Sequence, residues 1–217
     1  MGSYDIRDMY RLAVAEGEGY GTAYEYLVKL RLLEQQVGKN IRSVLIIGLP
    51  RKYGLGLDLA YYCQKNGCSM TVLEKSEKIG EMRRAAGKAG LIIRLVPERK
   101  TYDLCLSSGH YDNLTKNEKK QFLLNAKRAK QLIVFVPNSE NTNHRKHTGL
   151  KGMTAVCLAK EIRAKQYGWL DIPPFAPGKK LKKQKESGLL LLLLQIWTNI
   201  ERCLPRKKAH ICWAKTP

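Results

Sequence analysis

The fold is most tightly constrained by a series of short, unbroken apolar segments that alternate with helix-forming segments from residue 41 onward. Strands that are covered on both faces show such continuous apolar runs. The strand-like segments lie at residues 43–47, 70–73, 91–96, 104–107 and 132–136. Segments with helical character follow at about 57–65, 76–88, 116–129 and 154–165. A strand–helix–strand series requires right-handed crossovers, so the sequence predicts an α/β fold with a doubly wound, mostly parallel sheet and helices on both faces.

The two ends of the chain depart from this rhythm. The sequence "GWLDIPPF" indicates a short strand at 168–175, and a helix at about 188–203 precedes a closing strand at 209–215. The first forty residues read as helices broken by glycines. We therefore expect a single globular unit, in which a helical cap at 1–40 leads into the sheet domain at 41–217.

The formal net charge of +20 is unevenly distributed. Residues 1–40 contain five Lys/Arg and six Asp/Glu, and the densest basic runs fall at 116–130, 178–186 and 205–210. A positive field of this kind attracts anionic partners, RNA among them. A lysine-rich solvated surface needs no partner, and the runs lack the interleaved aromatics that single-strand binders use for stacking. An anionic acceptor and an RNA partner therefore both stay open.

The six cysteines form no C-x-x-C pair and lie mostly in apolar surroundings, as expected for reduced thiols in a cytoplasmic protein. The longest apolar run, "GLLLLLLQIW", is about half the length of a membrane span. The N-terminus shows no signal-peptide pattern. We expect a cytoplasmic protein with no membrane partner.

A glycine-rich loop directly follows the first apolar strand. Gly48, Gly54 and Gly56 have the spacing G-x5-G-x-G, which differs from the G-x-G-x-x-G fingerprint of dinucleotide enzymes. A loop at the carboxyl edge of an open α/β sheet is where such folds bind ligands, and here a ligand can lie against the backbone around Leu49 and Pro50. The glycines are equally consistent with a simple strand-to-helix turn.

An acidic residue ends the second strand. Glu74, followed by Lys75, comes about twenty residues after the glycine loop, the position at which nucleoside-binding α/β folds hold the ribose hydroxyls. The alternative is a solvent-facing carboxylate at the start of a helix, where it interacts favourably with the helix dipole. Together with the loop, Glu74 favours ribose binding.

Two further loops at the same edge carry polar side chains. The fourth strand ends in "CLSSGHYDN", which brings Ser107, Ser108 and His110 to the rim. The loop after the fifth strand contains His144 and His147. His110 and His144 are weak candidates for a general base, because polar loops often carry histidine without catalytic duty. Two histidines with one nearby glutamate make too poor a ligand set for a metal, so we expect none.

These parts, in this order, resemble the class I (Rossmann-like) S-adenosylmethionine-dependent methyltransferases over roughly residues 20–217. The resemblance is carried by "VLIIGLPRKYGLG", "TVLEKS", "YDLCLSSG", "LIVFVPN" and the closing "NIERCLPRKKAHICWAK". The helical lead "GYGTAYEYLVK" is similar to the segment that precedes the sheet in archaeal-type members. The resemblance implies a seven-stranded sheet with an antiparallel terminal strand, and a Rossmann-like methyltransferase domain at 41–217.

The resemblance also implies a cofactor, S-adenosylmethionine, and its contacts. The backbone around Gly48 would hold its methionine part and Glu74 its ribose. Pro97 and Glu98, at the end of the third strand, would border the adenine. Ser107 and Ser108 would face the methionine moiety or the methyl acceptor.

The sequence departs from the family in the length of the glycine loop, and it lacks the Asn/Asp-Pro-Pro-Tyr/Phe tetrad of enzymes that methylate adenine or glutamine amines. The acceptor, a small molecule, RNA or protein, is not identified. Two other functions stay open. One is a nicotinamide-dependent oxidoreductase on a similar sheet, and the other is a non-catalytic, basic nucleic-acid-binding protein on the same fold.

Overall fold

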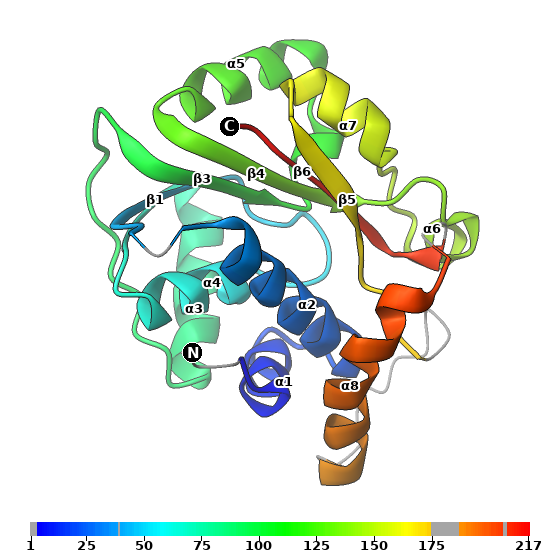
Figure 1. Cartoon of the computed structure of the whole chain (residues 1–217). Coiled ribbons are helices and arrows are strands. Elements are labelled where there is room, and N and C mark those ends of the chain that lie inside the picture. The colour runs from blue at the N-terminus through cyan, green and yellow to red at the C-terminus, as the bar shows by residue number, and fades with distance from the viewer. Residues whose placement is uncertain (1–3, 39, 175–186, 206–207) are drawn as a thin grey trace.

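In the part of the chain that the structure describes, six strands form one sheet in the order β2-β1-β3-β4-β6-β5. The computed structural model describes residues 4–38, 40–174, 187–205 and 208–217 (Figure 1). The strands are β1 (Ser43–Ile47), β2 (Ser69–Leu73), β3 (Tyr102–Ser108), β4 (Ala129–Pro137), β5 (Gln166–Leu170) and β6 (Ile211–Lys215). The four strands β2, β1, β3 and β4 pair in parallel, with Val44 of β1 opposite both Met70 and Leu104. Strand β6 lies antiparallel between β4 and β5.

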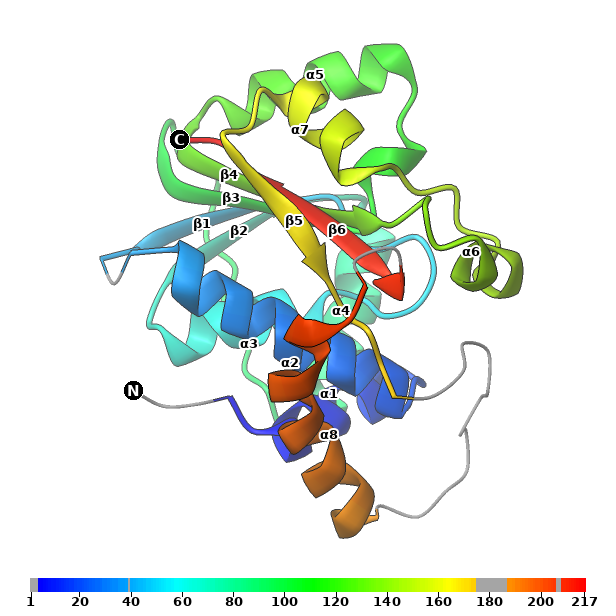
Figure 2. The ribbon, with the colours of Figure 1, turned by 45° about the vertical axis from the view of Figure 1, so that its right-hand side comes forward.

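Helices cover both faces of this sheet. Helices α1, α2, α3, α4 and α8 lie on one face, and α5 and α7 lie on the other (Figures 1 and 2). Their bounds are α1 (Ile6–Ala15), α2 (Tyr20–Gln36), α3 (Leu57–Lys65), α4 (Ser76–Lys88), α5 (Lys116–Ala126), α6 (Thr142–Thr148), α7 (Ala155–Ile162) and α8 (Gly188–Ile200). Single 3-10 turns, η1 (Tyr111–Asn113) and η2 (Glu201–Cys203), complete the described elements. The predicted doubly wound, mostly parallel α/β fold is confirmed.

Each face of the sheet has its own apolar cluster. On the α2 side, Leu27 and Leu30 are fully buried and share a cluster with Val44 and Ile46 of the central strand β1. On the other side, Leu45 and Ile47 of the same strand pack with Phe122 of α5 and Leu158 of α7. The alternation along β1 shows why its sequence reads as an unbroken apolar run: both of its faces are covered.

The prediction of a strand at 91–96, the third of the seven expected strands, is wrong for the described residues, whose sheet has six strands. Toward the sheet, the described residues of this segment make an isolated bridge between Leu95 and Met70 of β2 and a backbone bond from the Val96 N–H to the Met70 carbonyl. Ile92 is 63% exposed, so the segment lies at the edge of the sheet with one face open to solvent. Apolar composition alone did not distinguish such an edge from a covered strand.

Other boundaries shift by a few residues. The penultimate strand begins and ends earlier than expected, at Gln166 and Leu170, and α6 forms inside the loop that was expected after the fifth strand. Residue 175, at the end of the expected strand at 168–175, and the basic run at 178–186 lie outside the described residues, as do residues 206 and 207 of the final basic run. Within the described ranges, none of the helices combines the length and apolar character needed to cross a bilayer.

Candidate active site

The carboxyl edge of the sheet gathers most of the predicted site residues. Because β1, β2, β3 and β4 are parallel, the loops that leave them meet at this edge. They include the glycine loop at 48–56, Glu74 after β2, His110 after β3 and the segment that contains α6 after β4. Strand β6 runs the other way, so the residue that precedes it, His210, also lies at this edge. A site built here draws on β1, β2, β3, β4 and β6 and on the helix α2 beneath them (Figure 1).

Glu74 fastens the end of β2 to the glycine loop. Its Oε2 accepts a hydrogen bond from the backbone N–H of Leu49 at 2.9 Å, and its Oε1 accepts one from the N–H of Lys75 at 2.9 Å. Partial burial opposes the charge, but these two donors, with Lys78 and His110 nearby, lower the pKa of Glu74. The group is therefore an ionised carboxylate. Each oxygen keeps a lone pair for a further donor, such as a sugar hydroxyl.

The bare backbone of Gly48 is approached by a side chain from the next loop. Gly48 has a φ of +73°, and a Cβ at this position would clash with the imidazole ring of His110. Burial lowers the pKa of His110, and its buried Nδ1 has no hydrogen-bond partner among the described residues. Glycine is thus needed at position 48 for two reasons: the His110 ring packs directly against its backbone, and the backbone is left-handed there.

The far end of the glycine loop is held by the N-terminal helices. Glu16, which caps the C-terminus of α1, accepts hydrogen bonds through Oε1 from the N–H groups of Leu55 and Leu57, at 2.9 and 3.0 Å. Its other oxygen accepts a bond from the Tyr26 hydroxyl. Gly56, at the N-cap of α3, has no side chain to satisfy these donors, so a carboxylate from another helix caps α3. Burial raises the pKa of Glu16 to about 7.

Both serines at the end of β3 have structural partners. Ser107 is fully buried and donates its hydroxyl to the Ile47 carbonyl at 2.8 Å, which ties β3 to β1. The hydroxyl of Ser108 accepts from Lys29 Nζ at 3.1 Å. These contacts leave Ser107 pointing into the structure and make Ser108 part of a charged cluster.

The cluster around Lys29 is buried beneath the rim. Lys29 of α2 is 1% exposed, and its Nζ lies 2.7 Å from Asp58 Oδ2 and 2.9 Å from Glu25 Oε1. Burial disfavours the ammonium, but the two carboxylates outweigh it and raise the pKa of Lys29. Since Asp58 lies in the first turn of α3 and Ser108 ends β3, this one lysine joins the N-terminal helices to the carboxyl edge.

Pro97 and Glu98 are not brought to this edge. Glu98 Oε2 pairs with Arg128 Nη1 at 2.9 Å, and Arg128 directly precedes β4, at the amino edge of the sheet. The Pro97 carbonyl accepts from the Thr71 hydroxyl, in the middle of β2. Gly54 lies close to helix α2, because a Cβ at this position would clash with the Tyr26 hydroxyl. Gly48, Leu49, Pro50, Glu74 and Lys75 do lie together.

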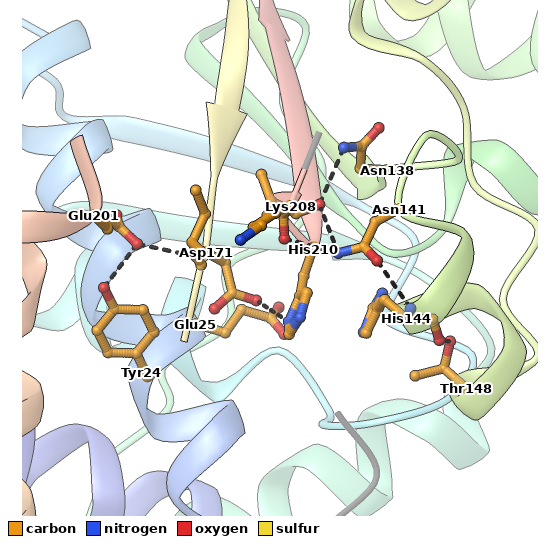
Figure 3. Close-up of polar contacts among 12 residues, drawn as sticks. Tyr24, Glu25, Asn138, Asn141, His144, Thr148, Asp171, Glu201, Lys208 and His210 are labelled. Atoms are coloured by element: carbon orange, nitrogen blue, oxygen red, sulfur yellow. Dashed lines mark hydrogen bonds and ion pairs between the residues drawn. The ribbon is translucent and has the colours of Figure 1, made fainter. Parts of the chain in front are cut away.

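A second group of polar side chains lies at the ends of β4, β5 and β6 (Figure 3). Asp171, directly after β5, places Oδ2 3.2 Å from His210 Nδ1. The His210 ring stacks on the ring of His144, with centroids 4.0 Å apart and planes 6° apart. Burial opposes a charge on His210, but Asp171, Glu25 and Glu201 outweigh it and raise its pKa. Burial, and then the neighbouring His210, lower the pKa of His144 to about 4.

Sequence reasoning missed Glu16, Lys29, Asp171 and His210. Lys29 and Glu16 are single charged residues within helical patterns, where a solvated position is the usual outcome. Asp171 belongs to "DIPPF", a segment that resembles a methylation tetrad only superficially. His210 ends a basic run. A usable signal was the position of Asp171 and His210, since each flanks one of the two late strands.

No protein-family model matches this chain, and no curated protein matches its sequence. Among solved structures, a chain of the complex between the Trm112 methyltransferase activator and a candidate methyltransferase from Haloferax volcanii aligns with a TM-score of 0.53 and 14% identity, over 95% of this chain and 92% of that one. An S-adenosylmethionine-dependent methyltransferase from Aquifex aeolicus aligns with a TM-score of 0.52 and 14% identity, over 77% of this chain and 94% of its own. A candidate sarcosine dimethylglycine methyltransferase from Galdieria sulphuraria gives 0.51 and 13%, over 86% and 82%.

At these identities, the comparisons establish the fold. The chain has the fold of these solved methyltransferase structures. In its own sheet, the antiparallel strand β6 lies next to the edge strand β5. What such a fold does is decided by the residues at its carboxyl edge.

Proposed function

We propose that this chain binds S-adenosylmethionine at the carboxyl edge and transfers its methyl group to an acceptor. The observation that carries the proposal is the position of Glu74, an ionised carboxylate bonded to the N–H of Leu49 in the glycine loop. A carboxylate beside bare backbone at the end of the second strand is the arrangement that holds a ribose against an α/β sheet. The fold of the solved neighbours supports the same assignment.

The residues at the edge fit the cofactor in most respects. Each Glu74 oxygen keeps an acceptor site for a ribose hydroxyl, with Lys75 alongside. The backbone of Gly48, Leu49 and Pro50 would border the methionine part. His110 lies where that part would approach Gly48, so binding requires its ring to turn away. Glu98 pairs with Arg128 at the other edge, and we therefore leave it out of the proposed site.

Methyl transfer from S-adenosylmethionine requires few catalytic groups from the protein. When bound, S-adenosylmethionine supplies an activated methyl group on a sulfonium. The chain would hold the acceptor in line with it, a contribution worth several kcal/mol of the barrier through positioning alone. A base is needed only where the acceptor must lose a proton.

The sheet topology speaks against the nicotinamide alternative. Dinucleotide folds of the doubly wound type place all their strands in parallel in the order 3-2-1-4-5-6. Here β6 is antiparallel and lies between β4 and β5. The glycine spacing of the loop also differs from the dinucleotide fingerprint.

Three finer assignments are part of the proposal. We assign the chain to the archaeal type of the fold, supported by its helical lead and by its alignment over 95% of its length with the Haloferax volcanii chain. We keep the division into a cap at 1–40 and a methyltransferase domain at 41–217, within one unit joined by the α2 core contacts. We keep a cytoplasmic location, supported by six unpaired cysteines.

Calorimetry tests the proposal directly. Folded protein is titrated with S-adenosylhomocysteine, with S-adenosylmethionine and, as the competing ligand, with NAD⁺. We expect heat of binding with the first two and none with NAD⁺. Binding of NAD⁺ alone, or of neither class, would refute the proposal.

A further inference from the structure

The pair formed by Asp171 and His210 is fixed from several sides. The Asp171 carbonyl accepts from the His210 N–H at 2.8 Å, and the Asn138 N–H donates to the His210 carbonyl at 2.7 Å. The backbone of His210 is thereby held between the ends of β4 and β5. Asp171 has a φ of +69°, a left-handed conformation that is unusual for a residue other than glycine. Strain of this kind concentrates at functional positions.

Asp171 has an unused acceptor. Its side chain is 4% exposed, and Oδ2 faces the imidazole of His210, while Oδ1 is buried with no hydrogen-bond partner among the described residues. Buried carboxylate oxygens are normally paired, and an unpaired one in a native structure calls for an explanation. A ligand that brings an N–H donor would supply the missing partner.

The hydrogen bond to Asp171 determines what the other edge of His210 can do. With Nδ1 donating its proton to Asp171, the neutral ring carries its free lone pair on Nε2. His144 covers one face of the ring, and it is itself uncharged at neutral pH because its pKa is about 4. Figure 3 shows the two imidazoles next to each other, His210 directly before β6 and His144 in α6. His210 is therefore oriented to accept a proton at Nε2.

The charges around the pair favour a cation. Glu25, Asp58 and Asp171 are three carboxylates, and Lys29 is the one ammonium that the described ion pairs set against them. Glu201, which accepts from the Tyr24 hydroxyl and the Ile172 N–H, lies on the far side of the pair, and the cation Arg31 acts on Tyr24 there as well. A chain of net charge +20 thus has a carboxylate-rich centre. Either an imidazolium at His210 or a bound cation reduces this excess of negative charge.

The same cluster adjoins the proposed cofactor rim. Lys29 Nζ contacts Glu25 on one side and Ser108, at the end of β3, on the other. Polar contacts therefore run from the carboxyl edge of β3 to Glu25, and the charge of Glu25 in turn acts on His210. An acceptor bound at this group would lie at the same carboxyl edge as the proposed cofactor site.

We propose that Glu25, His144, Asp171 and His210, here called the Asp171–His210 cluster, bind the methyl acceptor as a protonated amine, and that Nε2 of His210 removes its proton. This inference rests on the proposed methyltransferase function. His210 is the catalytic residue, and Asp171 is a positioning residue that sets its tautomer.

The step balances in atoms and charge. The ammonium R–NH₃⁺ gives one proton to Nε2 of His210, which leaves a neutral amine and an imidazolium, so the net charge of the cluster is unchanged. The amine lone pair then forms the C–N bond as the C–S bond breaks, and that electron pair stays on sulfur. The products are a methylammonium and S-adenosylhomocysteine, and the imidazolium later releases its proton to solvent.

The first experiment needs no acceptor. The full chain is labelled with ¹⁵N-histidine, its imidazoles are titrated by NMR, and His210 is assigned with His210→Gln. We expect the neutral His210 ring to carry its proton on Nδ1, and we expect Asp171→Asn to lower its pKa by about one unit or more. Asparagine tolerates the left-handed backbone, so this variant keeps the fold. A proton on Nε2, or an unchanged pKa in Asp171→Asn, would overturn the proposal.

The second experiment uses a cationic and an anionic probe. The chain saturated with S-adenosylhomocysteine is titrated with ethylammonium chloride, with sodium acetate and with sodium chloride. We expect ethylammonium alone to shift the His210 resonances. We also expect it to bind more tightly as the pH rises through the pKa of His210, because the neutral ring no longer offsets the negative charge of the carboxylates. Asp171→Asn should weaken this binding by about tenfold or more, and His147→Gln, an exposed histidine of α6, should not change it. A response to acetate alone, or an equal response to all three salts, would overturn the proposal.

These experiments test the methyltransferase function and the amine site independently of each other. If S-adenosylhomocysteine does not bind, the methyltransferase function falls, and the ethylammonium titration on the unloaded chain still reports on the cation site. If S-adenosylhomocysteine binds and ethylammonium does not shift His210, the cofactor assignment stands and the amine assignment falls.

Discussion

The carboxylate of Glu74 accepts a hydrogen bond from the backbone N–H of Leu49 at 2.9 Å, and this contact fastens the end of β2 to the loop that leaves β1. It brings together the acid and the glycine backbone that a bound nucleoside needs at the same time. The proposed function follows from this contact.

Replacing Glu74 should weaken cofactor binding. Glu74→Ala removes the acceptor for the ribose hydroxyls and the anchor of Leu49, so we expect the Kd for S-adenosylhomocysteine to rise by more than about tenfold, as for loss of a charge-assisted hydrogen bond. Calorimetry measures the change. Glu77→Ala, an exposed carboxylate in the first turn of α4, is the control and should leave the Kd unchanged. Equal affinity in Glu74→Ala and wild type would show that the ribose lies elsewhere.

Removing the His110 ring should strengthen cofactor binding. The imidazole fills the approach to Gly48, so part of the binding free energy is spent on turning it away. We expect His110→Ala to lower the Kd for S-adenosylhomocysteine by up to about tenfold in calorimetry. Weaker binding in His110→Ala would mean that the ring contacts the cofactor instead of blocking it.

Lys29 should be among the most important residues for stability. Lys29→Ala leaves Asp58 and Glu25 buried without their cation, and breaking a buried ion pair from one side costs about 3–5 kcal/mol. Urea denaturation measures the loss in the free energy of unfolding. Lys120→Ala, an exposed lysine on α5, should change it by less than about 0.5 kcal/mol. Similar stability of the two variants would contradict the buried ion-pair cluster.

Glu16 should make stability depend on pH. Its pKa is about 7 in the folded chain and 4.5 in its ordinary state, so the folded chain binds more protons between these values. The free energy of unfolding should therefore fall as the pH rises from about 4.5 to about 7, by roughly 3 kcal/mol at most from this group. Glu16→Gln keeps an acceptor for Leu55 and Leu57 but cannot titrate, so the difference between wild type and Glu16→Gln should shift in the same range. A pH-independent difference would contradict the raised pKa.

Much of the fold could be predicted from the sequence because β1 and its neighbours are covered on both faces. Each of these strands is an apolar run between helix signals, and the order of runs fixes a doubly wound sheet. The segment at 91–96 was misjudged because Leu91 is buried while Ile92 is exposed, and an apolar edge residue looks the same in the sequence as a core one.

The site was predictable only where one residue ends a strand. Glu74 and Ser108 could be found from their positions in the strand pattern. Asp171 and His210 come together through the antiparallel pairing of β5 with β6, which a single sequence does not specify. Glu98 was misplaced relative to the edge because the segment at 91–96 meets β2 near its start, at Met70, and this register cannot be read from the sequence.

The most direct test of the central claim is a crystal structure of the chain with S-adenosylhomocysteine. We predict that the ribose hydroxyls lie within hydrogen-bond distance of the Glu74 carboxylate, with the amino-acid part along the backbone of Gly48 and the His110 ring turned away. A nucleoside bound away from Glu74, or a crystal grown in saturating ligand with His110 still packed on Gly48 and no ligand at the rim, would contradict the account.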